Sequence, residues 1–352
     1  MKRIVLTGGG TAGHVSPNQA LIPELLKEGW EIHYIGTNGI EKGLIESMDS
    51  VEYHTIHSGK LRRYFDVKNF TDIFRVIAGF FESISILRKL KPQIVFAKGG
   101  FVSVPVVYSA ALLRIPVVMH ESDITPGLAN KLCKPFCRAL CTTFPECAKA
   151  VGEKGVVTGT PLRKQLFSGT RQQGLDLTGF DGKKPILMMT GGSLGAQSVN
   201  AVLREALPSL LPDFDILHIC GRGNRSEEHA NIPGYVQFEY LSEEMPNAYA
   251  CADIILSRAG SNSVSEILAL KKPALLIPYH SGRGDQVLNA RSVEARGLCR
   301  VLPQSEMTAA SLTEALHHLY ESRNEIVLAL DALPDSDGTE AVMKQIRLYA
   351  NK

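Results

Sequence analysis

The sequence predicts an α/β protein that contains two parallel sheets. Short apolar runs alternate with longer segments of helical periodicity over most of the chain, and this alternation is typical of βαβ units. A glycine-rich turn follows an early strand in each half of the chain. The length of 352 residues favours two domains of ordinary size.

The expected strands fall into two series. In the first half they are RIVLT, EIHYIG, QIVFAKG, IPVVMHE, ALCTT and GVVTG. In the second half they are PILMMT, FDILHIC, YVQFEYL, DIILSRAG, PALLIPY and GLCRVL. Between them, VVTGTPLRKQLFSGTRQQGLDLTGFDGKKP is rich in glycine and polar residues and has no sustained periodicity. We therefore expect one domain over residues 1–161 and a second over residues 162–335.

The two halves also resemble each other. The segment IVLTGGGTAGHVSPNQAL matches ILMMTGGSLGAQSVNAVL, and both suggest a strand, a glycine turn and a helix. Such a repeat favours two similar Rossmann-like domains. Because ligands of these domains bind at the carboxyl ends of the strands, we expect the site at that edge of both sheets.

The first glycine turn leaves its ligand open. Gly8, Gly10 and Gly13 fit G-x-G-x-x-G, and such a turn lets backbone N–H groups approach a phosphate. A dinucleotide site also needs an acidic residue about 20 residues further on. The second strand ends instead in Gly-Thr-Asn at residues 36–38. Nicotinamide or flavin binding is therefore disfavoured. Two alternatives remain open: the turn binds the phosphate of a different ligand, or it binds no ligand.

Polar side chains follow two strands of the second half. Glu266 falls near the start of a helix, where its carboxylate could bind a ribose diol or simply interact with the helix dipole. Asp285, Gln286 and Asn289 follow the next strand. Amides and carboxylates suit sugar hydroxyls because together they offer donors and acceptors; the alternative is an ordinary polar loop.

Composition argues against several classes of protein. The formal net charge is +2, with 44% hydrophobic and 21% charged residues, which predicts a globular protein with no nucleic-acid partner. We find no secretory signal and no apolar run near the roughly 20 residues of a membrane span, so we expect a cytoplasmic protein. Cys133, Cys137 and Cys141 recur every fourth residue, which on a helix would place them on one face. Core positions are favoured for them over a metal site.

The motifs GGGTAGH, HESDITPGLAN, GTPLR, GGSLGAQS, SRAGSNSVSEI and DQVLNA, in this order, resemble the MurG family. These UDP-N-acetylglucosamine (UDP-GlcNAc) transferases complete the lipid-linked disaccharide precursor of peptidoglycan. The resemblance implies a GT-B architecture: two Rossmann-like domains facing a cleft, with a helix in residues 336–352 returning to the first domain. It also implies inverting transfer from UDP-GlcNAc to the C4 hydroxyl of undecaprenyl-diphospho-muramoyl pentapeptide, with no metal and no cofactor.

The same resemblance assigns residues to the substrates, with the donor mainly on the second domain. Arg163 and Ser193 would contact the diphosphate, Glu266 the ribose, and Gln286 with Asp285 the sugar hydroxyls. Residues 11–13 would close over the donor from the first domain. The full set of expected substrate-binding residues is Thr11, Ala12, Gly13, Asp123, Arg163, Ser193, Ser261, Asn262, Ser263, Val264, Ser265, Glu266, Asp285 and Gln286.

His14 is the expected general base. The attacking hydroxyl must lose a proton, and an imidazole with a pKa near neutrality suits that role. The alternative is that His14 only binds a phosphate or the loop backbone. His120 and Glu121 are weaker candidates, which could instead fix the wall of the site.

The chain departs from the family pattern at several positions. It has Ser122 and Asp123 where the family usually has Gln-Asn, Leu194 where it usually has Gln, and Ala12 where it often has Gly. An added carboxylate near a diphosphate is unfavourable unless it is paired. A second, paralogous copy with altered activity is therefore an alternative.

The segment KLRRYFDVKNFTDIFRVIAGFFESISILRKLK suggests contact with an anionic membrane at the cytoplasmic face. Lys and Arg outnumber Asp and Glu in it by eight to three, and Phe70, Phe74, Ile77 and Phe81 follow helical spacing. Basic, aromatic-rich surfaces bind anionic bilayers. Alternatively, the aromatic side chains face the core.

Other functions remain open on the sequence alone. They are a GT-B transferase for another lipid such as diacylglycerol, a UDP-GlcNAc 2-epimerase, and a non-catalytic UDP-sugar sensor. An epimerase should retain several acid/base carboxylates around the sugar, and the sequence offers few.

Overall fold

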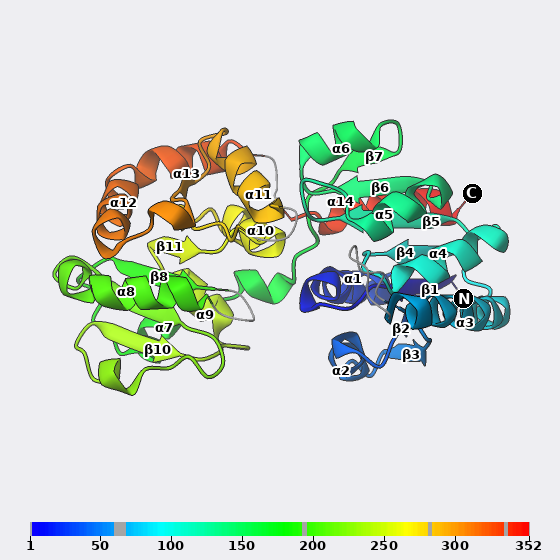
Figure 1. Ribbon diagram of the computed structural model, residues 1–352, viewed down its shortest axis with the longest axis horizontal. Helices are drawn as coiled ribbons and strands as arrows, with labels where there is room; N and C mark the ends of the chain where they lie inside the picture. The colour runs from blue at the N-terminus through cyan, green and yellow to red at the C-terminus, as the bar shows by residue number, and fades with distance from the viewer. Residues whose placement is uncertain (1, 60–67, 192–195, 281–283, 334–336, 352) are drawn as a thin grey trace. The chain divides into compact units, whose positions relative to one another are not determined.

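The computed structural model describes residues 2–59, 68–191, 196–280, 284–333 and 337–351. The chain forms two compact units (Figure 1). Unit 1 comprises Met1–Arg163 and Asp337–Lys352, and unit 2 comprises Lys164–Ser336.

Unit 1 is built on a seven-stranded parallel sheet with the order β3-β2-β1-β4-β5-β6-β7. Its strands are β1 (Lys2–Thr7), β2 (Trp30–Gly36), β3 (Val51–Thr55), β4 (Ile94–Ala97), β5 (Val117–Glu121), β6 (Ala139–Thr142) and β7 (Gly155–Val157). The strand order reverses between β1 and β4, which places the switch point of the sheet after these two strands. The edge strand β3 was not among the strands predicted from the sequence.

The helices of unit 1 are α1 (Ser16–Lys27), α2 (Ile40–Glu46), α3 (Lys68–Leu90), α4 (Ser103–Leu112), α5 (Leu128–Cys133), α6 (Pro145–Val151) and α14 (Thr339–Ala350). The last of these confirms the expected returning helix. Val342, Met343 and Ile346 of α14 are fully buried in the apolar cluster that also contains residues of α1 and β1. Burial of such side chains contributes roughly 1.5–3 kcal/mol each. Arg347 pairs with Glu28 at 2.6 Å.

Unit 2 is built on a six-stranded parallel sheet with the order β10-β9-β8-β11-β12-β13. Its strands are β8 (Ile186–Thr190), β9 (Asp215–Ile219), β10 (Tyr235–Phe238), β11 (Ile254–Ser257), β12 (Ala274–Leu276) and β13 (Arg300–Val301). Its helices are α7 (Arg171–Thr178), α8 (Gln197–Leu210), α9 (Met245–Cys251), α10 (Ser261–Ala269), α11 (Asp285–Glu294), α12 (Ala309–Glu321) and α13 (Arg323–Asp331). Strand β8 is the counterpart of β1 beside a switch point, which confirms the repeat seen in the sequence.

Helix α7 lies in the stretch that showed no periodicity. Its ends carry local signals instead: the Thr170 hydroxyl accepts from the backbone N–H of Gln173, and Gly179 ends the helix in the left-handed conformation. In the part of the chain that the structure describes, no helix has the length and apolar content to span a bilayer.

Candidate functional site

The first glycine turn is fixed by close packing at the carboxyl end of β1. Gly10 has a φ of +84°, and a Cβ atom there would lie 2.5 Å from the Phe101 ring. A Cβ atom on Gly8 would lie 2.6 Å from the carbonyl oxygen of His14. A Cβ atom on Gly100 would collide with the carbonyl oxygen of Gly9. The loops after β1 and β4 therefore pack against each other, and only glycine permits this approach.

A buried carboxylate holds this turn in place through hydrogen bonds. Glu41 of α2 is fully buried and accepts hydrogen bonds from the backbone N–H groups of Gly10 at 3.2 Å and Thr37 at 3.0 Å. The Gly10 amide, which the motif suggested for a phosphate, thus already has an anionic partner. Sequence reasoning missed Glu41 because it sought an acidic residue at the end of β2 and not on the helix that follows.

His14 lies in a 3₁₀ turn over Ala12–His14, just before α1. It is half-buried, and its Nδ1 is 2.8 Å from the hydroxyl oxygen of the exposed Thr11. If Nδ1–H donates to Thr11, the neutral ring keeps its lone pair on Nε2, which is the tautomer that a base acting through Nε2 needs.

A buried lysine connects the loops after β4 and β5. Lys98 is 2% exposed, and its Nζ donates to the Ser122 hydroxyl at 2.7 Å. Burial lowers the pKa of Lys98 to about 8, although the carboxylates of Glu121 and Asp123 act in the opposite direction. Ser122, a departure from the family pattern, thus has a defined partner. Lys98 was overlooked in the sequence, where FAKGG at a strand end is its only signal.

His120 and Glu121 hold the loop after β5 in place. The Glu121 carboxylate accepts from the backbone N–H groups of Asp123 at 3.1 Å and Gly127 at 2.7 Å. His120 is fully buried with its Nε2 2.9 Å from the carbonyl oxygen of Gly159, and burial holds the pKa of His120 well below its usual value. This geometry supports the structural role that we considered for both residues.

In unit 2, the loop after β11 leads into α10, where the expected nucleoside-binding residues begin. Ser261, Asn262 and Ser263 are half-buried in the first turn. The side chains of Val264 and Ser265 are buried, and the Ser265 hydroxyl donates to the carbonyl oxygen of Ser261 at 2.8 Å. These last two side chains therefore serve the helix itself.

Glu266 is half-buried in the second turn of α10. Its Oε2 accepts from the hydroxyl of Tyr249 at 3.1 Å. Tyr249 is 1% exposed, so this bond restricts the carboxylate. A restricted carboxylate is better prepared to bind a diol than a freely rotating one.

Arg258 is a second cation, in unit 2, that the sequence analysis missed. It follows β11, and its guanidinium donates to the carbonyl oxygen of Ile277 at 3.2 Å, to Gln304 Oε1 at 2.7 Å and to the Ser198 hydroxyl at 3.0 Å. It also lies 5.3 Å from the centre of the Tyr279 ring. Burial lowers the pKa of Arg258, but arginine stays charged at neutral pH. The carboxyl edge of unit 2 therefore has a fixed positive charge.

The remaining expected residues differ in their burial and in their hydrogen-bond partners. Gln286 Oε1 accepts from the backbone N–H of Tyr279 at 3.0 Å, and Asp285 is half-buried at the start of α11. Asn289 is buried and donates to the carbonyl oxygen of Ala259 at 3.3 Å, so it supports the loop after β11. Arg163 is exposed at the end of the first segment of unit 1.

Two expected positions, Ser193 and Leu194, lie outside the described residues. The prediction that the three cysteines share a helix face is wrong. Cys133 ends α5, Cys137 follows a 3₁₀ turn, and Cys141 lies on β6. All three are buried, and burial raises the pKa of Cys133 and of Cys141 to about 12.

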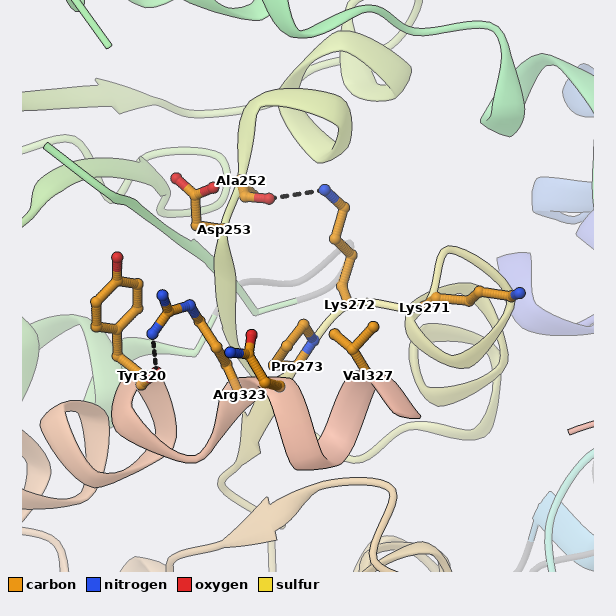
Figure 2. A pocket seen from close by; sticks show the side chains of 9 residues that line it. Ala252, Asp253, Lys271, Lys272, Pro273, Tyr320, Arg323 and Val327 are labelled. Carbon is orange, nitrogen blue, oxygen red and sulfur yellow. Dashed lines mark hydrogen bonds between the residues drawn. The ribbon is translucent and has the colours of Figure 1, made fainter. Parts of the chain in front are cut away.

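A pocket in unit 2 lies near the amino ends of the strands, on the side of the sheet opposite to the expected site (Figure 2). Its lining includes Asp253, Lys271, Lys272 and Pro273, which precede β11 and β12. Figure 2 shows two hydrogen bonds in this pocket, from Lys272 to the carbonyl oxygen of Ala252 and from Arg323 to the carbonyl oxygen of Tyr320. The first of these has a length of 2.7 Å. Because ligands of open α/β sheets bind at the carboxyl ends, this pocket does not replace the expected site.

Helix α3 confirms the helical spacing predicted for the basic, aromatic segment. The exposed fractions are 46% for Ile73, 71% for Phe74, 48% for Ile77 and 63% for Phe81. The alternative that these side chains face the core is therefore wrong for this group. The Phe70 side chain and residues 60–67 lie outside the described part.

Comparisons with known proteins cover nearly the whole chain. Residues 4–142 match the glycosyltransferase family 28 N-terminal domain, and residues 186–334 match the glycosyltransferase family 28 C-terminal domain. A UDP-N-acetylglucosamine–N-acetylmuramyl-(pentapeptide) pyrophosphoryl-undecaprenol N-acetylglucosamine transferase of Clostridium kluyveri is 52% identical over 353 residues, covering 99% of this chain and 100% of the relative. The transferase of the same name from Clostridium botulinum is 51% identical, covering 99% of each. The crystal structure of Acinetobacter baumannii MurG superposes with a TM-score of 0.78 at 25% identity, covering 99% of each chain.

Proposed function

This chain belongs to glycosyltransferase family 28, and on that premise we propose that it transfers GlcNAc from UDP-GlcNAc to undecaprenyl-diphospho-muramoyl pentapeptide. The observation that carries the proposal is identity above 50% with transferases of that name over practically the whole chain. The same relatives favour transfer over epimerisation, over sugar sensing and over transfer to diacylglycerol.

The donor binds to unit 2 in this proposal. Glu266, restricted by Tyr249, accepts hydrogen bonds from the ribose, and Gln286 with Asp285 binds the sugar hydroxyls. Ser261–Ser263 offer hydroxyl, amide and backbone N–H groups at a helix amino terminus, where negative charge is stabilised. Ser193 and, from unit 1, Arg163 contact the diphosphate, so neutralisation of the leaving UDP does not need a metal.

The acceptor and the base belong to unit 1. The C4 oxygen forms a bond to the anomeric carbon while the bond from that carbon to the diphosphate oxygen breaks, and UDP leaves with the electron pair. Nε2 of His14 takes the hydroxyl proton, while Thr11 holds the ring through Nδ1. Attack from the face opposite the leaving group inverts the α linkage to β. Residues 11–13 approach the donor from this loop.

The charge of Lys98 explains how this chain can have Asp123 where the family usually has asparagine. Asp123 lies close enough to the Lys98 ammonium to raise the pKa of that lysine. The positive charge in turn offsets the carboxylate beside an anionic acceptor. Asp123 can therefore stand near the diphosphate at little electrostatic cost while Lys98 is protonated.

Membrane contact belongs to α3. A protein with a lipid-linked acceptor must reach a bilayer, and Phe74 and Phe81 are the most exposed of the apolar side chains that the structure describes on this helix. Arg75, Arg88 and Lys89 of the same helix are also exposed. Apolar insertion with flanking cations favours the anionic surface at the cytoplasmic face.

The test is product analysis. The purified protein is incubated with labelled UDP-GlcNAc and the undecaprenyl-linked acceptor, in chelator, with diacylglycerol and no acceptor as parallel reactions. We expect a β-linked disaccharide lipid only with the muramoyl acceptor. Formation of UDP-N-acetylmannosamine without acceptor, or a product only on diacylglycerol, would contradict the proposal.

A further inference from the structure

Three side chains outside the proposed active site lie together at the β3 edge of unit 1. His33 is on β2, and Glu52 and His54 are on β3. The strand register pairs His33 with Glu52, and His54 follows two positions later. Because alternate residues of a strand share a face, all three project from one face of the sheet.

Their ligand atoms lie within 4.8 Å of one another, close to the spacing of a tetrahedral metal site. His33 Nδ1 is 3.2 Å from His54 Nε2 and 3.3 Å from Glu52 Oε2, and His54 Nε2 is 3.7 Å from Glu52 Oε1. Bonds of 2.0–2.1 Å at the tetrahedral angle place ligand atoms about 3.3–3.4 Å apart. An ion can therefore contact all three groups with little rearrangement.

A second carboxylate, that of Glu31, fixes which ring nitrogen of His33 carries the proton. Glu31 Oε1 is 3.0 Å from His33 Nε2, and Glu31 Oε2 is held by Arg3 at 2.8 Å. Donation of Nε2–H to Glu31 leaves the Nδ1 lone pair facing Glu52 and His54. A carboxylate on the far nitrogen of a histidine is the usual outer partner of a metal-binding imidazole.

The two histidine ligands are largely buried, whereas the glutamate ligand is exposed. The exposed fractions of the side chains are 2% for His33, 19% for His54 and 66% for Glu52. The fourth position thus opens to solvent. Lys89 of α3 is the cation whose field reaches His54, and it is exposed, so water screens it.

We propose that His33, Glu52 and His54 bind Zn²⁺, or a divalent ion of similar preference, with water as the fourth ligand. Two imidazoles and one carboxylate suit zinc, whereas magnesium and calcium prefer oxygen ligands. The ion ties the edge strand β3 to β2. Since none of the three residues is among those assigned to the donor, the acceptor or the base, we expect the ion to take no part in glycosyl transfer.

The test is zinc titration of chelator-treated full-length protein by calorimetry. We expect one site that weakens at least tenfold in E52Q and in H54Q, and by 10–100-fold in E31Q, which changes only the outer partner. H317Q is the matched control, because His317 also pairs with a carboxylate, Asp213 at 3.0 Å, but in unit 2. Its zinc affinity should equal that of the wild type.

Thermal unfolding provides the second measurement. Zinc should raise the melting temperature of the wild type and of H317Q but not of H54Q, while all variants unfold alike in chelator. Glycosyl transfer should be the same with and without zinc. Wild-type protein that binds zinc no more tightly than H54Q would overturn the proposal, and so would E52Q and H54Q variants that both bind as the wild type does.

Discussion

The carboxyl edges of the two sheets follow matching sequence segments but are charged differently: unit 1 holds the buried Glu41 and Lys98 side chains, whereas unit 2 holds the half-buried Arg258 guanidinium. In unit 1, the Glu41 carboxylate already accepts from Gly10 under the glycine turn. In unit 2, the Arg258 guanidinium joins the ends of β11 and β12 and the start of α8. The comparison teaches that strands in matching positions can carry different charges at their carboxyl ends, so the charged side chains, and not the glycine motif alone, decide whether an anion is attracted.

The largest expected effect is on the base in unit 1. His14→Ala should lower turnover by about 10²–10⁴-fold, the usual range for loss of a general base. The dissociation constant for UDP-GlcNAc should change little, since most of the donor contacts are assigned to unit 2. Turnover at saturation and calorimetry on the same variant check this. Near-normal turnover would mean that His14 is not the base.

The matching test in unit 2 is Glu266→Ala. Loss of a charge-assisted hydrogen bond to the ribose should weaken UDP-GlcNAc binding by roughly 1.5–3 kcal/mol. Tyr249→Phe keeps the carboxylate but removes its restraint, so it should weaken binding less. Unchanged affinity in folded Glu266→Ala would remove Glu266 from the donor site.

The buried anion in unit 1 is tested by Glu41→Ala. The N–H groups of Gly10 and Thr37 would lose their acceptor, and a hydrogen bond to a charged group contributes about 1.5–3 kcal/mol. Urea unfolding should show this loss, whereas Glu46→Ala on the exposed part of the same helix should show almost none. Equal stability of the two variants would refute the supporting role of Glu41.

The double variant Phe74→Ser/Phe81→Ser should reduce binding to anionic vesicles on the order of tenfold, because buried phenylalanine stabilises insertion. Its stability in solution should be preserved, since both side chains are exposed. Vesicle sedimentation measures the effect. Leu328→Ser, with a side chain 70% exposed in unit 2, is the control. Equal vesicle binding by the double variant and the wild type would exclude this face of α3 as the membrane contact.

The smallest effect concerns pH. The Lys98 ammonium is lost as pH rises through its pKa of about 8, so Asp123 is no longer offset. KM for the lipid acceptor should then rise a few-fold while KM for UDP-GlcNAc stays constant. Lys98→Met should abolish this dependence, and a wild-type acceptor KM that is flat across this range would contradict it.

The free energy of unfolding should increase with pH over the range in which acceptor binding weakens. The pKa of Lys98 is lower in the folded protein than its usual value of 10.5, so the unfolded chain binds more protons between about pH 8 and 10.5. The contribution of Lys98 to stability therefore rises with pH in this window. Urea unfolding of wild type and Lys98→Met measures the difference.

Sequence patterns were sufficient for most of the fold. Strands buried on both faces are continuous apolar runs, and β1, β4, β5 and β8 were found on that signal. Strand β3 was missed because VEYHT lies at an edge and is only partly buried, so it carries Glu52 and His54 where a central strand would carry apolar residues.

The site was predicted less completely than the fold. Positions in recognisable motifs, such as His14 and Glu266, could be named from the sequence. Glu41, Lys98 and Arg258 could not, because each matters through partners distant in the chain: Gly10, Ser122 and Ser198 respectively. A lone charged residue has no local signature of burial.

The returning helix α14 makes unit 1 a discontinuous domain. The chain leaves this unit after Arg163 and re-enters it at Asp337, and α14 then supplies Val342, Met343 and Ile346 to the core. During synthesis, the apolar surface that receives α14 stays uncovered until unit 2 and then α14 have emerged from the ribosome. Unit 1 is thus translated first and completed last, and its exposed core would be most vulnerable to aggregation or proteolysis in that interval.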